Sequence, residues 1–329
     1  METEPALLPI PGELVDPPAR DLPDRVVLLQ SREGAVGTGV SVGVRTGHRF
    51  TASRATLLAA GTAYYLFLAL FSVLTLAYGL AAALGAEQLS AYVTEAMSQA
   101  FPGLVGGAGI DPEQLRTIAQ TTSIVGAVGL LYGATGAVLG ASRALHTVYG
   151  APNNSRNVVW VRIWSLGWFL VLAPLVLLSF VSASFTADLS ARLLDALGLT
   201  WDGSTLLLGV AALALTMVLN FLVIHLMLAR LGGIRPARAP LLVGAGVGAV
   251  VIEVLKQVMA LLVGFVIDKP QYGALSAPIG IMFVLYLQSA ALYLVASLTA
   301  ALAEVRSEGR EAAPADEAEP EASIGSQRG

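Results

Sequence analysis

Long stretches without a charged residue constrain this chain more than any other feature of its sequence. No Asp, Glu, Lys or Arg occurs between Arg54 and Glu87, which leaves an uncharged window of 32 residues. About 20 apolar residues are enough for a helix to cross the hydrocarbon core of a bilayer. Charged residues make up 13% of the 329 positions, against about 25% in an average soluble chain. The sequence therefore indicates lipid-facing helices rather than a large water-facing surface.

Five further windows have the same character. Four of them carry no charge, and each is long enough to cross once: 117–142, 163–187, 203–229 and 270–303. The fifth, at 239–267, is interrupted by Glu253 and Lys256. Counting it as a span predicts an all-α integral membrane protein with six transmembrane helices. We expect a mobile N-terminal tail over 1–50, a transmembrane domain over 51–305 and a disordered acidic C-terminal tail over 306–329.

The basic residues predict the orientation of these spans. Of the 19 Lys and Arg residues, 15 lie before the first uncharged window, after the last one, and in the connections at 143–162 and 230–238. The positive-inside rule then places both termini in the cytoplasm, as expected for a multi-pass protein of a bacterial inner membrane. Membrane lipids are the expected partners, because arginines in these connections would face an anionic leaflet, although topology alone also explains them. These arginines are Arg143, Arg156, Arg162, Arg230, Arg235 and Arg238.

The other connections carry helix signals of their own. Apolar residues between Leu89 and Phe101 recur at helical spacing and predict an outer amphipathic helix that ends before Pro102. Asp111 and Pro112 are typical of a helix start, so we expect the second membrane helix to begin there. Leucines between Leu189 and Leu197 predict a second, shorter outer helix.

Composition and motifs argue against several functions. A net charge of −4 and the lack of a basic stretch with interleaved aromatics do not suit nucleic-acid binding. The chain has no cysteine, and its three histidines lie in separate segments without metal-ligand spacing, so we expect no metal and no cofactor. No GxSxG, HExxH or P-loop pattern occurs, and we expect no enzymatic activity and no catalytic residue.

Glu253 and Lys256 are the candidate functional residues, since they are the only charges inside a predicted span. A charge at the bilayer centre costs about 2.5–3.5 kcal/mol, so both should face the bundle or water and pair. Their spacing of three places them on one helix face. Either they form a purely structural pair, or they belong to a substrate or ion pathway. In the second case Glu253 holds a proton or cation, Lys256 attracts an anionic headgroup, and neighbouring spans contribute Asn220, Gln257 and Gln288.

A stripe of glycines marks the second span. These residues follow one another at spacings of 3, 4, 3 and 4, and small residues let helix backbones approach closely: Gly126, Gly129, Gly133, Gly136 and Gly140. The sequence leaves open whether this helix-packing seam lies inside one chain or joins two copies in a homo-oligomer.

Five segments together resemble the YihY/BrkB virulence factor family of bacterial inner-membrane proteins, over roughly residues 52–305. They are LLAAGTAYYLFLALFSVL, the FPG at 101–103, GLLYGATGAVLGASRALHTVYG, RLGGIRPARAPLLVGAGVGAVVIEVLKQVM and YGALSAPIGIMFVLYLQSAALYL. The strongest matches are Glu253, Lys256 and the pair Tyr272–Gly273. The resemblance implies a six-helix envelope protein that transports or flips a lipid-like substrate. A membrane scaffold that moves nothing is the alternative.

Overall fold

The computed structural model describes the backbone of residues 30, 34–83, 112–151, 158–197, 202–233, 237–267 and 276–316, and these residues form helices and short turns without any strand. The elements in chain order are α2 (Ala35–Ala52), α3 (Ala55–Ala83), α5 (Pro112–Tyr149), α6 (Val158–Leu197), α7 (Asp202–Leu226), the π-helical turn η3 (Met227–Leu231), α8 (Arg238–Ile267) and α9 (Ser276–Asp316). The prediction of an all-helical chain is confirmed over these ranges.

Six long helices, α3 and α5–α9, take up the six predicted windows. Among the described residues, four helices are long and apolar enough to cross a membrane, within Val159–Val176, Leu213–Leu231, Arg238–Lys256 and Pro278–Glu308. A fifth apolar stretch, Ala55–Leu70, is shorter. The chain is thus a helical protein whose described part has four helices that could span a membrane, while the count of six spans stays a prediction.

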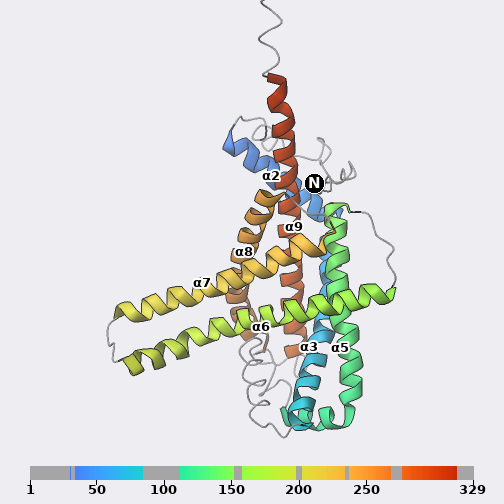
Figure 1. The fold of residues 1–329 in the computed structure, drawn as a ribbon, viewed down its shortest axis with the longest axis vertical. Helices are drawn as coiled ribbons and strands as arrows, with labels where there is room; N and C mark the ends of the chain where they lie inside the picture. Colours follow the sequence, from blue (N-terminus) through green and yellow to red (C-terminus); the bar gives the residue numbers. More distant parts are fainter. Residues whose placement is uncertain are drawn as a thin grey trace, which may run out of the picture.

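The helices form an upright group and a hairpin that crosses it. α3, α5, α8 and α9 run along the long axis of the molecule, with α3 packed on α5 and α8 packed on α9. α6 and α7 pack against each other and run across this group (Figure 1). The hairpin meets the upright helices where α6 contacts α5 and where α7 contacts α8. These crossings position the polar side chains discussed below.

Small residues let the upright helices approach closely. A Cβ atom at Gly133 of α5 would lie 2.5 Å from the backbone nitrogen of Ala69 in α3, so only glycine fits there. The buried core beside this contact is also rich in small side chains, including Ala55, Ala59 and Ala141. Large apolar side chains are exposed on the outer faces instead, as expected for surfaces that contact lipid.

Both predicted tails are shorter than expected. Residues 35–50, assigned to a mobile N-terminal tail, belong to α2, so that prediction is wrong for this segment. The glycine-spaced sequence resembles a loop, but Val42, Thr46 and Arg49 lie on one helix face and are buried. α2 packs on α9, and tertiary packing overrides weak helix propensity. At the other end α9 continues to Asp316, so disorder from residue 306 is wrong for 306–316.

The helix-end predictions have mixed outcomes. α5 begins at Pro112, which confirms the predicted start of the second long helix. Residues 189–197 form the last turns of α6 rather than a separate outer helix. The predicted amphipathic helix at 89–101 lies outside the described residues.

Candidate functional site

The two intramembrane charges lie one turn apart on α8 and meet polar side chains of the crossing hairpin. Glu253 and Lys256 form an ion pair with Oε2 and Nζ 3.4 Å apart. Asn220 of α7 and Ser179 of α6 contact them, and both are almost completely buried. We refer to these four residues, Ser179, Asn220, Glu253 and Lys256, as the hairpin cluster.

Lys256 occupies the centre of the hairpin cluster. Its ammonium nitrogen lies 2.7 Å from Ser179 Oγ and 3.0 Å from Asn220 Oδ1, in addition to the 3.4 Å contact with Glu253 Oε2. A lysine ammonium has three N–H donors and no acceptor. The three contacts therefore satisfy all of its donors, two of them through neutral oxygens.

The remaining hydrogen bonds close the hairpin cluster into a ring. The Asn220 amide nitrogen donates to Glu253 Oε2 at 3.0 Å, and the Ser179 hydroxyl donates to Asn220 Oδ1 at 2.6 Å. Asn220 thus contacts the carboxylate with one end of its amide and the ammonium with the other. The side chains of Glu253 and Lys256 are each only 8% exposed. A charged pair this well enclosed is stable in an apolar protein because its hydrogen bonds replace those to water.

The structure brings together part of the predicted set and adds one residue. Glu253, Lys256 and Asn220 converge as proposed. Gln288 lies on α9, and the Gln257 side chain is outside the described residues. Ser179 was missed because it is one of several serines in an apolar stretch, and nothing in the sequence distinguishes it from the others.

The glycine seam of α5 faces α3. Side chains at Gly133 and Gly136 would collide with the Ala69 backbone and the Tyr65 ring, and Gly140 lies against Thr62. These three glycines therefore pack two helices of one chain. Gly129 is half-buried, and the surroundings of Gly126 lie outside the described part of the chain.

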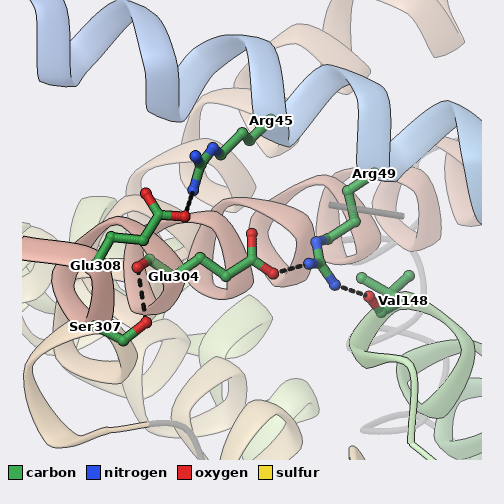
Figure 2. A network of polar contacts seen from close by, with 6 residues as sticks. All are labelled: Arg45, Arg49, Val148, Glu304, Ser307 and Glu308. Carbon is green, nitrogen blue, oxygen red and sulfur yellow. Dashed lines mark hydrogen bonds and ion pairs between the residues drawn. The ribbon is translucent and has the colours of Figure 1, made fainter. Parts of the chain in front are cut away.

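A second group of charges joins the two ends of the described chain. Arg49 of α2 forms an ion pair with Glu304 of α9, and Arg45, one turn earlier, pairs with Glu308 at 2.7 Å. Figure 2 shows that these pairs connect α2 to α9 and that the Arg49 guanidinium also reaches the end of α5, where it donates to the carbonyl of Val148 at 2.8 Å. We refer to Arg45, Arg49, Glu304, Glu308 and the Val148 carbonyl as the terminal clasp.

Arg49 is fully buried, whereas Arg45 lies at the edge of the terminal clasp. Burial lowers the pKa of Arg49 from its usual value because desolvation disfavours the charged form, and the Glu304 carboxylate acts in the opposite direction. Its bond to Val148 satisfies one of the carbonyls left without a partner at a helix C-terminus. Arg49 therefore holds three helices together.

The structure corrects the position expected for Arg162. Arg162, assigned to a cytoplasmic connection, belongs to α6, and its guanidinium donates to the Thr135 hydroxyl of α5 at 3.1 Å. Its guanidinium carbon also lies 6.0 Å from the centre of the Tyr132 ring. Thr135 precedes the end of α5 by 14 residues, or about 21 Å along a helix.

Within the described ranges no group of three or more His, Asp or Glu side chains is arranged to hold a metal ion. The hairpin cluster instead combines one carboxylate, one ammonium and two neutral polar groups. Such a set is suited to binding ions or charged headgroups by hydrogen bonds and charge.

Comparison with known proteins gives one match. The family model described as Virulence factor BrkB matches residues 46–320, which include the hairpin cluster and every member of the terminal clasp except Arg45. No curated protein and no solved structure matches the chain.

Proposed function

The chain belongs to the virulence factor BrkB family, and we propose that it is an inner-membrane protein that moves an anionic, lipid-like amphiphile across the bilayer with the hairpin cluster as its headgroup site. The observation that carries this proposal is the buried Glu253–Lys256 pair within a helix that is apolar enough to span a membrane. Ionisable groups at such positions are expensive and frequently mark substrate or ion pathways.

The ligands of Lys256 support an anionic substrate. Two of its three contacts are to neutral oxygens, those of Ser179 and Asn220. A phosphate oxygen in their place would bring a negative charge, so that both partners of the hydrogen bond would be ionised. Glu253 would neutralise the ammonium while the site holds no substrate. A headgroup can therefore exchange with side chains of α6 and α7 without leaving the ammonium unpaired.

The position of the hairpin cluster supports movement at this site. Its residues come from the α6–α7 hairpin on one side and from α8 on the other, so the polar contacts lie at a boundary between two packed units. Displacing the hairpin would open the cluster without disturbing the packing of α8 on α9. Alternating exposure of such a boundary is a recurring way of moving a substrate.

The terminal clasp supports the proposed orientation. α2 near the N-terminus and the end of α9 pack together through two ion pairs, so we place both on the same side of the membrane. The concentration of basic residues in the tails and in two connections favours the cytoplasm for that side.

A non-transporting scaffold is the second candidate. It is favoured by the complete set of contacts at Lys256, because an ammonium with three satisfied donors can fix the hairpin to α8 permanently. In that case the hairpin cluster only stabilises the fold.

Reconstitution in sealed vesicles tests the proposal. We expect the wild-type protein to carry labelled phosphatidylglycerol between leaflets faster than protein-free vesicles do. Lys256→Met should reduce the rate per folded molecule at least tenfold. The matched control is Val254→Ala, an exposed position between the two charges, which should keep the wild-type rate. A wild-type rate equal to that of protein-free vesicles would favour the scaffold.

A further inference from the structure

Five exposed arginines lie toward one end of the upright helices. They come from the start of α3, the last turns of α5, the turn η3, the start of α8 and the late part of α9. We refer to them as the arginine collar: Arg54, Arg143, Arg230, Arg238 and Arg306. Among the described residues, no ion pair or hydrogen bond involves their guanidinium groups.

Contacts between helices place the first members of the arginine collar at one level. Arg49 of α2 reaches Val148 near the end of α5, and α3 begins shortly after α2 with Arg54 just before it. The Ser142 hydroxyl donates to the carbonyl of Leu231 at 2.8 Å, which brings Arg143 and Arg230 to the same height.

A second set of contacts places the remaining two arginines. Gly244 of α8 lies directly against Thr299 of α9. The two helices run in opposite directions along the long axis (Figure 1). Six residues before Gly244 and seven residues after Thr299 therefore lie close to one level, which is where Arg238 and Arg306 are found. Glu304, between Thr299 and Arg306, contacts Arg49 and ties this level to the end of α5.

Among the described side chains at this end, positive charges outnumber negative ones. The described carboxylates, Glu304 and Glu308, pair with Arg49 and Arg45. The arginine collar adds five positive charges to these two ion pairs. Farther from this end, the same helices expose large apolar side chains, including Leu57 of α3, Leu242 of α8 and Leu294 of α9. Guanidinium groups at one level with exposed apolar side chains farther from the end match a leaflet, with phosphates outside the acyl chains.

We propose that the arginine collar binds the phosphate headgroups of anionic phospholipids in the leaflet at this end of the molecule. Arginine is suited to this because its planar guanidinium donates two parallel hydrogen bonds to a phosphate. The inference concerns a surface separate from the hairpin cluster and does not depend on transport. It also excludes Arg162, whose guanidinium contacts Thr135 and Tyr132 well below this level.

The test measures lipid association with the full chain in vesicles of phosphatidylcholine. Spin-labelled phosphatidylglycerol and phosphatidylcholine serve as probes, and the ratio of their association constants is the readout. We expect a clear preference for phosphatidylglycerol that falls with each arginine replaced by glutamine, by at most about fivefold per arginine. With all five replaced, the ratio should approach one.

Three controls keep this test decisive. Arg162→Gln should leave the ratio unchanged, because Arg162 lies outside the arginine collar. Replacing the five arginines by lysine should retain most of the preference, and single Arg→Gln variants serve if the fivefold variant does not insert. An unchanged ratio in the glutamine variants would overturn the proposal. Displacement of the labelled lipid by inorganic phosphate would also overturn it and would assign the surface to a soluble anion.

Discussion

The hairpin cluster and the terminal clasp are both buried groups of charges, but they differ in how the chain builds them. The hairpin cluster has both charges on one helix, three residues apart, and adds neutral side chains from two neighbours. The terminal clasp joins Arg49 to Glu304, which are separated by 255 positions. The comparison teaches that a charge pair within one span can be found by inspection of the sequence, whereas a pair between distant helices becomes visible only in the fold.

The largest effect is expected at the centre of the terminal clasp. Arg49→Met removes the ion pair with Glu304 and the hydrogen bond to the Val148 carbonyl, and removing one partner of a buried pair costs about 3–5 kcal/mol. Thermal unfolding in detergent should show a strongly lowered Tm, and limited proteolysis should cut within α2. The double variant Arg49→Met/Glu304→Leu should recover much of the loss. A single variant as stable as the wild type would show that α2 does not depend on Arg49.

A somewhat smaller effect is expected in the hairpin cluster. Lys256→Met removes the ammonium and leaves Glu253 with the Asn220 amide as its remaining partner in the cluster, at a cost of about 3 kcal/mol. The double variant Lys256→Met/Glu253→Leu should restore stability, because a buried ion pair and apolar residues of similar volume are often equivalent. Thermal unfolding of the single and double variants measures both effects. A double variant less stable than either single variant would contradict this account.

A glycine-to-alanine change between α3 and α5 tests helix packing without altering a charge. It therefore sharpens the comparison between the two charged groups. Gly133→Ala pushes a methyl group onto the Ala69 backbone and should cost about 1–3 kcal/mol through strain between α3 and α5. Gly246→Ala on α8 is the matched control, because no atom lies within 4 Å of the added Cβ. Its stability should be unchanged or slightly increased, since alanine is the better helix former. Equal Tm values for the two variants would show that the glycine seam is looser than described.

The smallest effect is expected at the edge of the terminal clasp. Glu308 is 55% exposed, and ion pairs near a protein surface contribute about 0–1 kcal/mol. Arg45→Met should therefore change the Tm little, and raising the salt concentration should reduce the difference further. If Arg45→Met destabilised the protein as much as Arg49→Met, burial would not be what separates the two pairs.

Much of the fold could be predicted because it depends on local composition. Uncharged windows identify the long helices, and Pro112 marks the start of α5. α2 could not be predicted, since its glycine-rich sequence is a poor helix former and its stability comes from packing on α9. Nor could the continuation of α9 to Asp316, whose sequence is typical of a disordered tail.

The candidate site could also be predicted only in part. Glu253 and Lys256 could be predicted from their cost in an apolar span, and Asn220 from its depth. Ser179 could not, because its role depends on the crossing of α6 over α8, which no local pattern encodes. The displacement of Arg162 from a connection to the side of α5 has the same cause, since α6 crosses α5 as well.

The headgroup preference of lipid crossing tests the central claim most directly. In sealed vesicles, the wild-type protein should carry labelled phosphatidylglycerol faster than labelled phosphatidylcholine, because the phosphate that pairs with Lys256 is balanced by a choline cation only in phosphatidylcholine. Lys256→Met should abolish the difference. Equal rates for both lipids in the wild type, or an undiminished preference in Lys256→Met, would contradict the assignment of the hairpin cluster as the headgroup site.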